Sequence, residues 1–362
     1  MRVLFIDFTT ALNTVDDLKT RARGGMVSSL FLVPNALSQL NMDVSVWSDI
    51  GAGGTTDKGV RWYTVEDYDE VVRQQWDCLV MNRGIGNGYP EIKAKHRILW
   101  THDLVHGGHA PYPEYLKSLS ATVFMSRYAE WIWRIYYPQI GKSFRIPNGV
   151  DRSIFYPRKK DLDYLIYISA PNRGLNRLGM IYESVKAKTG LPLTMKAFSN
   201  MAILHPGERE AKKGDIAHEG NDDLFGTKYL PSEECGVQVL NPLPQPLLGE
   251  ELGKAGLMIL PTGYPEICSN AVLQSLACGT PIVTTGNLGA TGEWVKLNDN
   301  GFLTKTQLSD YTVHLTEIMR GTVDILTDRK KHLKMIINAE RTKIHSWDEI
   351  GSLWANMLKA LC

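Results

Sequence analysis

One carboxylate and one amide flank a predicted helix start in segment 261–284. The segment reads as a buried strand (Leu257–Leu260), a Gly/Pro turn that carries Glu266, a helix with a small, polar first turn, and a second buried strand (Pro281–Thr284). The first N–H groups of a helix lack partners and carry partial positive charge, so they bind phosphate readily. Gln274 lies two helical turns on. This arrangement suits a sugar diphosphate, which has hydroxyls on either side of its charge.

The segment resembles the nucleotide-sugar site of retaining glycosyltransferases with the GT-B fold, especially glycosyltransferase family 4. In that family a Glu is followed after seven residues by a second Glu, then by a helix end of the type Ala-Cys/Ala-Gly-Thr/Val-Pro. Glu266 matches the first Glu, which implies that it holds hydroxyls of the donor sugar. Gln274 stands where the second Glu holds the ribose, and so departs from the pattern. The local pattern also fits an ordinary strand–turn–helix–strand unit that stops at Gly279-Thr280-Pro281.

The same resemblance implies further contacts to the donor. Ile267, Cys268 and Ser269 match positions whose backbone amides face the sugar and the diphosphate, and the helix amide of Asn270 continues this row. Gly24-Gly25 resembles the family's first glycine loop, which approaches the donor phosphate from the N-terminal domain. The motifs occur in the family's order along nearly the whole chain, and this order is more specific than any single motif.

Arg173 follows the first strand of the second half and precedes Gly174. The family carries a basic residue and a Gly there, which implies a cation on the leaving diphosphate, and an arginine can hold two phosphate oxygens at once. A second base usually lies five residues earlier, where this chain has Ile168. Arg177, one helical turn beyond Arg173, is a candidate replacement. A surface role at a helix start is the less favourable alternative, because cations are disfavoured there.

His102 and Asp103 end a strand of the first half, and ligands of open α/β sheets gather outside the carboxyl ends of strands. The family has a His at an equivalent position near the donor sugar, so we expect His102 to touch the sugar. Asp103 is expected to orient His102 or to contact the acceptor. His106 and His109 lie in the next loop, which fits either an acceptor rim or a plain glycine loop.

Other chemistries are disfavoured by spacing. Residues 84–88 (Gly-Ile-Gly-Asn-Gly) lack the spacing of a dinucleotide loop, so no nicotinamide or flavin cofactor is expected. Asp67-Tyr68-Asp69 and Asp161-Leu162-Asp163 imitate a metal-binding Asp-x-Asp without its strand-end context, and no divalent metal is expected. The aromatic run Tyr128–Tyr137 could rest on a membrane surface or hold an acceptor, but core packing is expected because a single basic residue accompanies it.

Composition bounds the class of protein. The 362 residues are 43% hydrophobic and 22% charged, with net charge +1, which favours two globular domains and no electrostatic attraction to nucleic acid. The apolar run at the N-terminus is too short for a signal peptide, and no run approaches a membrane span. The five cysteines form no matched metal-type pairs and are expected to be reduced thiols of a cytoplasmic protein.

Apolar runs that alternate with helical patterns predict an α/β protein with parallel sheets covered on both faces. The predicted strands are Val3–Ile6, Val44–Trp47, Cys78–Met81, Arg97–Thr101, Ala121–Phe124, Leu165–Ser169, Leu193–Ala197, Gly236–Leu240, Leu257–Leu260 and Pro281–Thr284. A break near Pro147-Asn148-Gly149-Val150-Asp151 resembles the family's interdomain passage. The resemblance then implies a GT-B fold of two doubly wound Rossmann-like domains facing a cleft: an acceptor domain (1–150), a nucleotide-sugar domain (151–343), and a C-terminal helix (344–362) that crosses back to the first domain.

These features predict a retaining, metal-independent hexosyltransferase that needs no cofactor and moves a hexose from a nucleoside diphosphate sugar to a glycan. Weak peripheral contact with a membrane is a possible addition. Two alternatives stay open: a sugar-nucleotide epimerase of the same architecture, and a non-catalytic sugar-nucleotide binder. The binder gains support from Gln274 and from Ile168 in a usually basic position.

Overall fold

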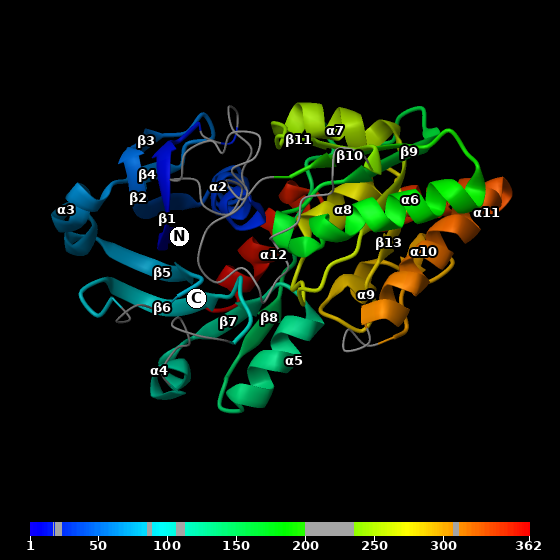
Figure 1. Ribbon diagram of the computed structural model, residues 1–362. Helices are drawn as coiled ribbons and strands as arrows, with labels where there is room; N and C mark the ends of the chain where they lie inside the picture. The colour runs from blue at the N-terminus through cyan, green and yellow to red at the C-terminus, as the bar shows by residue number, and fades with distance from the viewer. Residues whose placement is uncertain (17, 19–23, 85–88, 106–112, 200–234, 307–310) are drawn as a thin grey trace, which may run out of the picture. The chain divides into compact units, whose positions relative to one another are not determined.

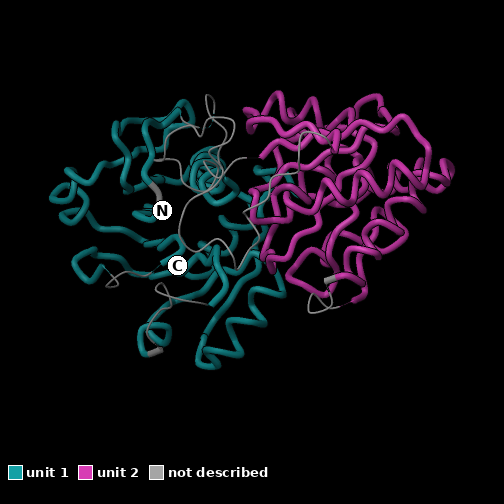
Figure 2. The backbone as a smooth tube through the Cα atoms, viewed as in Figure 1, with its two compact units in different colours: residues 1–149, 345–362 teal, residues 150–344 magenta. Residues whose placement is uncertain are grey.

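The computed structural model describes residues 1–16, 18, 24–84, 89–105, 113–199, 235–306 and 311–362. The chain divides into two compact units (Figure 2). One consists of Met1–Gly149 together with His345–Cys362, and the other of Val150–Ile344. Each unit contains one sheet and its own buried hydrophobic core.

The first unit is built on a sheet whose strand order is β3-β4-β2-β1-β5-β6-β7-β8 (Figure 1). The strands are β1 (Arg2–Thr14), β2 (Asp43–Ala52), β3 (Gly54–Thr55), β4 (Arg61–Tyr63), β5 (Gln75–Asn82), β6 (Lys93–Trp100), β7 (Ala121–Phe124) and β8 (Ser143–Arg145). Neighbouring strands are parallel except β3 and β4. Every strand predicted for this half overlaps an observed one. The unpredicted β3, β4 and β8 are too short to produce an apolar run.

Helices cover this sheet, and the last helix of the chain is one of them. They are α2 (Gly25–Ser38), α3 (Tyr68–Arg73), α4 (Pro113–Ser118), α5 (Arg127–Tyr136) and α12 (Trp347–Lys359), with a 3-10 turn η1 (Val65–Asp67). A capping box between Ser346 and Glu349 starts α12. Gly351 lets α12 approach α2 closely, because a Cβ there would lie 2.6 Å from the Ala36 side chain. The predicted return of the C-terminal helix to the first unit is therefore confirmed.

The Asn-Gly turn of the predicted interdomain passage supports this return. A Cβ on Gly149 would lie 2.9 Å from backbone atoms of Ser346 and Trp347. A glycine is needed here for close approach of two backbones, since any side chain would push the start of α12 away.

The second unit is a parallel sheet of order β11-β10-β9-β12-β13-β14. Its strands are β9 (Asp161–Tyr167), β10 (Thr194–Phe198), β11 (Val237–Leu240), β12 (Ala255–Leu260), β13 (Ile282–Thr284) and β14 (Gly301–Leu303). Its helices are α6 (Leu178–Thr189), α7 (Gln245–Lys254), α8 (Asn270–Ala277), α9 (Thr291–Trp294), α10 (Tyr311–Thr327) and α11 (Arg329–Arg341). Every residue of β12 is buried, as expected for a parallel strand covered on both faces.

Two further findings concern the described residues. None of the helices there is long and apolar enough to cross a bilayer. All five cysteines are free thiols, and the sulfur atoms of Cys78 and Cys362 lie 3.7 Å apart.

Candidate active site

The second sheet reverses its winding direction between β9 and β12. From β9 the chain adds β10 and β11 on one side, and it then returns to add β12, β13 and β14 on the other. In open α/β sheets, ligands bind outside the carboxyl ends of the strands at such a switch point. The segments that leave β9 and β12 there carry Arg173 and Glu266, respectively.

Gly174 allows these two segments to touch. It separates the 3-10 turns η2 (Pro171–Arg173) and η3 (Leu175–Arg177), and its φ of +99° lies in the left-handed region that favours glycine. A Cβ at this position would clash with the carbonyl oxygen of Pro261. Arg177 Nη1 donates a hydrogen bond to the same Pro261 carbonyl at 2.9 Å. The basic pair predicted from the sequence therefore lies against the loop that carries Glu266.

Arg173 and Glu266 form an ion pair. Arg173 Nε donates to Glu266 Oε1 at 2.9 Å, and the two side chains are 15% and 14% exposed. Arg173 Nη1 donates to Asn172 Oδ1 at 2.6 Å, and the guanidinium carbon lies 3.8 Å from the centre of the Tyr264 ring. The guanidinium is thus held by a carboxylate, an amide and an aromatic face.

The loop after β13 fixes the backbone of Glu266. Ala290 N donates to the Glu266 carbonyl at 2.6 Å. Gly289 adopts a φ of +74°, and a Cβ there would clash with that carbonyl oxygen. Carboxyl-end loops of three adjacent strands, β9, β12 and β13, therefore meet at Glu266: Arg173 after β9 binds its carboxylate, and the loop after β13 holds its backbone.

The helix α8 begins just after this carboxylate. Ser269 is its N-cap residue, but the Ser269 side chain makes no capping hydrogen bond. Ile267 and Ser269 are buried, whereas Cys268 and Asn270 are partly exposed. Because a helix N-terminus attracts anions, this turn is suited to a phosphate group. Donor contacts of these four residues stay predictions.

Gln274 lies in the second turn of α8 and is partly exposed, while its neighbours Leu273 and Ser275 are buried. The side chain is therefore on the open side of the helix rather than in the core. Its predicted role toward a ribose remains a prediction. Ile168 is 7% exposed and belongs to the hydrophobic core of the second unit, so the usual second base is replaced by an apolar side chain.

The first sheet has its own switch point, between β1 and β5. Asp7, 2% exposed, accepts hydrogen bonds from Asn82 Nδ2 at 2.6 Å and from the Thr9 backbone N at 2.7 Å and Oγ1 at 2.6 Å. Burial raises the pKa of the Asp7 carboxyl, while these hydrogen bonds and Arg83 lower it. Asn82 Oδ1 is buried without a hydrogen-bond partner among the described residues.

Arg83 and Asp103 extend this polar cluster. Arg83 binds the Asp103 carboxylate with both Nε, at 2.6 Å, and Nη2, at 3.2 Å. The Arg83 backbone has a φ of +64°, which is uncommon for a non-glycine residue and is often found at functional sites. Asp7, Thr9, Asn82 and Arg83 were not predicted as site residues from the sequence. The available signal was the polar residues that directly follow the first and third predicted strands.

His102 is neutral at pH 7. Burial lowers its pKa to about 3. The residue as a whole is partly exposed, but its Nε2 atom is buried and has no hydrogen-bond partner in the described part of the chain. The ring lies 4.4 Å from the Trp100 ring. A neutral imidazole in this position could donate or accept one hydrogen bond, and it could not supply a positive charge. Contact of His102 with a sugar stays a prediction.

Gly24 and Gly25 open α2, with Gly24 as its N-cap residue. The first N–H groups of a helix lack intrahelical partners, which suits an anion, and contact of Gly24 and Gly25 with the donor phosphate stays a prediction. The predicted helix over Val27–Leu40 is observed as Gly25–Ser38. His106, and the sequence 85–88 of the rejected dinucleotide loop, lie outside the described residues.

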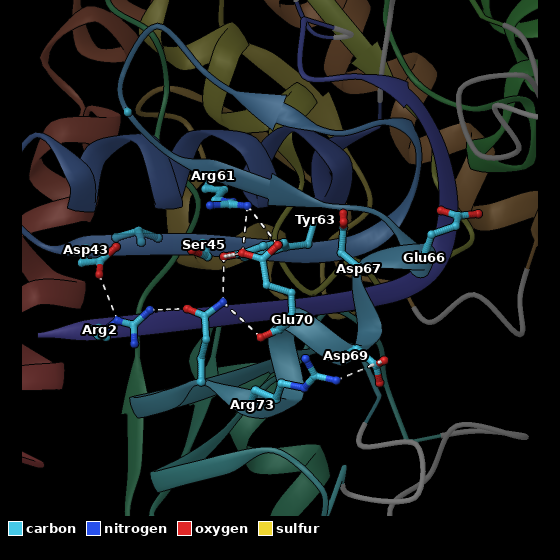
Figure 3. Close-up of a pocket in the computed structure, with 13 residues that line it drawn as sticks. Arg2, Asp43, Ser45, Arg61, Tyr63, Glu66, Asp67, Asp69, Glu70 and Arg73 are labelled. Atoms are coloured by element: carbon cyan, nitrogen blue, oxygen red, sulfur yellow. Dashed lines mark hydrogen bonds and ion pairs between the residues drawn. The ribbon is translucent and has the colours of Figure 1, made fainter.

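A surface pocket of about 720 Å³ lies at the opposite, amino edge of the first sheet (Figure 3). Its charged side chains pair with one another: Arg2 with Asp43 at 3.0 Å, and Arg61 with Glu70 at 2.8 Å. Strands β1, β2 and β4 begin here rather than end. Since ligands of parallel sheets bind at the carboxyl edge, we do not assign the active site to this pocket.

Both Asp-x-Asp pairs have structural partners. Asp67 closes a capping box with Thr64, and Asp163 pairs with Arg329. Among the described residues, no group of three or more His, Cys, Asp or Glu side chains is arranged to hold a metal ion.

The aromatic run on α5 is only partly in the core. Ala129 and Trp133 are buried, and Trp133 Nε1 donates to the Asp103 carbonyl at 2.9 Å. Trp131, Ile135 and Tyr136 are instead 59%, 56% and 62% exposed. The expectation of core packing is therefore wrong for these three residues, because they lie on the solvent side of an amphipathic helix.

Comparison with known proteins establishes the architecture. No family model and no curated protein sequence matches the chain. Solved structures do match. Sucrose-phosphate synthase from Thermosynechococcus elongatus superposes with a TM-score of 0.71 and 14% identity, over 100% of this chain and 99% of that one. The chain has the GT-B fold.

Two more glycosyltransferase-fold structures extend the comparison. HepE from Anabaena, in complex with UDP-glucose, has a TM-score of 0.65 and 15% identity, and the match covers 99% of this chain and all of HepE. WaaG, a glycosyltransferase involved in lipopolysaccharide biosynthesis, has a TM-score of 0.66 and 11% identity, over 98% of this chain and 99% of WaaG. At these identities the similarity establishes the fold, and activity is argued from the site.

Proposed function

We propose that this protein is a glycosyltransferase that moves a hexose from a nucleoside diphosphate sugar to a glycan acceptor, with retention of the anomeric configuration. The observation that carries the proposal is the Arg173–Glu266 pair at the switch point of the second sheet, just before the N-terminus of α8. A guanidinium and helix N–H groups suit a diphosphate, and a carboxylate suits sugar hydroxyls. The HepE structure with UDP-glucose supports this donor class.

In this proposal the second unit binds the donor and the first unit binds the acceptor. Arg173, the amides near Ser269 and Asn270, and Gly25 stabilise the charge of the departing diphosphate. That diphosphate takes the proton of the acceptor hydroxyl on the face where the new bond forms. Catalysis then rests on positioning and charge stabilisation, for which the chain's own groups supply the positive charge without a divalent metal or cofactor.

The acceptor is assigned to the carboxyl edge of the first sheet. Thr9 is exposed there, and the Arg83–Asp103 pair is partly exposed, with side chains at 27% and 36%. Asp103 and His106 were predicted as acceptor contacts, and Arg83 and Thr9 join Asp103 in one cluster. Such paired donors and acceptors are suited to sugar hydroxyls.

Ligand-induced stabilisation tests the donor class directly. A ligand that binds only the native state raises stability in proportion to RT ln(1 + [L]/Kd). In a thermal-shift panel of UDP-, GDP-, ADP- and TDP-sugars, we expect at least one to raise the Tm, and the matching nucleoside monophosphate to raise it less. Absence of a shift with every sugar nucleotide would contradict the proposal.

Product analysis separates the two alternatives. An epimerase converts the donor with no acceptor present, and a non-catalytic binder is stabilised by the donor but neither hydrolyses nor transfers it. We expect transfer products only when an acceptor glycan is added.

Gln274 offers a graded test of the ribose contact. A carboxylate can accept hydrogen bonds from both ribose hydroxyls, and charge-assisted hydrogen bonds exceed neutral ones by roughly 1 kcal/mol. We therefore expect Gln274→Glu to keep activity and tighten donor binding several-fold, and Gln274→Ala to weaken it. Titration of both variants with the donor decides the point: unchanged affinity in Gln274→Ala would exclude the ribose role.

Weak peripheral contact with a membrane is a further part of the proposal. The exposed apolar side chains Trp131, Ile135 and Tyr136 on α5 support it. Reduced sedimentation with anionic phospholipid vesicles after Trp131→Ser and Ile135→Ser would confirm it, and unchanged sedimentation would contradict it. The free thiols are in keeping with the predicted cytoplasmic location.

A further inference from the structure

Two side chains that the proposed function assigns to different parts of the donor are bound to each other. Arg173 is assigned to the diphosphate and Glu266 to the sugar hydroxyls. In the structure Arg173 Nε donates to Glu266 Oε1 at 2.9 Å, and both side chains are largely shielded from water. The ion pair therefore occupies the groups that the donor needs.

The guanidinium cannot bind a phosphate side-on, through Nε and Nη2, without a change at this contact. An arginine binds two oxygens of one phosphate most strongly through a fork of parallel N–H groups, and Nε forms half of its side-on fork. Glu266 holds Nε, while Asn172 Oδ1 holds Nη1 at 2.6 Å. The Tyr264 ring covers one face of the guanidinium at 3.8 Å. Bidentate binding of a phosphate through Nε thus competes with the Glu266 carboxylate.

A bare nucleoside diphosphate and a sugar nucleotide differ in whether they give the Glu266 carboxylate a new hydrogen-bond partner. If a bare nucleoside diphosphate takes Arg173, the Glu266 carboxylate loses its partner and lies, poorly solvated, beside a second anion, which is unfavourable. If the nucleotide carries a sugar, its hydroxyls can donate hydrogen bonds to the same carboxylate. The loss of the ion pair is then offset.

We propose that Glu266 competes with the diphosphate for Arg173 and releases Arg173 only to a nucleotide that carries a sugar. This inference rests on the proposed function and deepens it. Glu266 becomes a specificity-determining residue that favours the sugar nucleotide over the nucleoside diphosphate product. Once the hexose has left, the carboxylate reclaims the arginine and promotes release of the product.

The test compares binding of UDP, GDP, ADP and the corresponding glucose nucleotides to the full-length protein by titration calorimetry. We expect Glu266→Gln to bind the nucleoside diphosphate about tenfold more tightly than the wild type does, which is the size of one charge-assisted contact. Affinity for the sugar nucleotide is expected to stay equal or fall, so the preference for the sugar-bearing ligand shrinks. Neither change needs turnover to be measured.

Three controls separate direct competition from a general electrostatic effect. In an Arg173→Gln background, Glu266→Gln is expected to tighten diphosphate binding much less than it does with Arg173 present, because the shared partner is gone and only the repulsion between the two anions is relieved. Glu266→Asp keeps the charge but shortens the reach, so it is expected to tighten diphosphate binding as the Gln variant does. Glu317→Gln is the matched carboxylate control. Glu317 is also 14% exposed and binds the Lys305 and Thr306 amides just after β14, so no tightening is expected.

The outcomes distinguish this inference from the proposed function. If the wild type and Glu266→Gln bind the nucleoside diphosphate equally, or if Glu317→Gln tightens binding as much, the competition is overturned while the donor class stands. If no nucleoside diphosphate and no sugar nucleotide binds the wild type, the proposed function fails and the inference fails with it. Circular dichroism and Tm values of each variant establish that it is folded.

Discussion

Replacement of Glu266 by glutamine is expected to lower glycosyl transfer by about 10²–10⁴-fold, because two hydrogen bonds from sugar hydroxyls lose a charged acceptor, each worth about 1.5–3 kcal/mol. Glutamine has nearly the same shape, and its Oε1 can accept a weaker, uncharged hydrogen bond from Arg173 Nε, so the Tm is expected to change little. The measurement is kcat/KM for the donor in a steady-state transfer assay, paired with thermal unfolding.

Glu317→Gln again provides the matched control. It removes one carboxylate of equal exposure from the same edge of the second sheet. Near wild-type transfer is expected in this variant. Retained turnover in Glu266→Gln would remove Glu266 from the site, and equal losses in both variants would point to a general effect of charge. The two results together test the assignment of Glu266 rather than the architecture.

Trp354→Ala is expected to lower the free energy of unfolding of the first unit by about 3–5 kcal/mol, the usual cost of truncating a buried large aromatic residue. Trp354 is fully buried, and its ring lies 4.9 Å from Trp100 and 5.9 Å from Phe5. It therefore joins the last helix of the chain to the central strands of the first sheet. The loss would leave a large cavity between these elements.

Urea unfolding followed by tryptophan fluorescence suits this measurement, since all tryptophans except Trp294 lie in the first unit. Leu353→Ala is the control on the same helix. Leu353 is 38% exposed, so its truncation is expected to change stability by no more than about 0.5–1 kcal/mol. A loss in Trp354→Ala no larger than in Leu353→Ala would contradict the role of Trp354 in joining α12 to the sheet.

The order and type of the elements could be predicted from local patterns. Apolar runs such as Cys78–Met81 and Leu257–Leu260 became the buried strands β5 and β12. Apolar residues recur at helical spacing in the last segment, at Ile350, Leu353, Trp354, Met357, Leu358 and Leu361. Four of the six are buried in α12, but Leu361 is partly buried and Leu353 is 38% exposed. These features follow from period and composition, because strands and helices bury residues at fixed intervals. The GT-B fold was predicted correctly because the motifs occur in one order along the chain.

Short elements and individual side chains were harder to predict. Strands β3, β4, β8 and β14 have two or three residues each, so their pairing depends on the neighbouring strands rather than on their own pattern. The exposed Trp131 and Ile135 on α5 were expected in the core. Apolar side chains need not be buried, and composition alone does not show which side of a helix meets the sheet.

Sequence alone determined that Arg173 and Glu266 each follow a strand, and that a helix start lies beyond Glu266. Only the tertiary structure decided that they meet. They are 93 residues apart, and β9 and β12 become neighbours because the sheet reverses its winding between them. The close approach also depends on Gly174, which has no side chain to hold the two loops apart. Long-range pairing of this kind arises from sheet topology and packing, which no local pattern encodes.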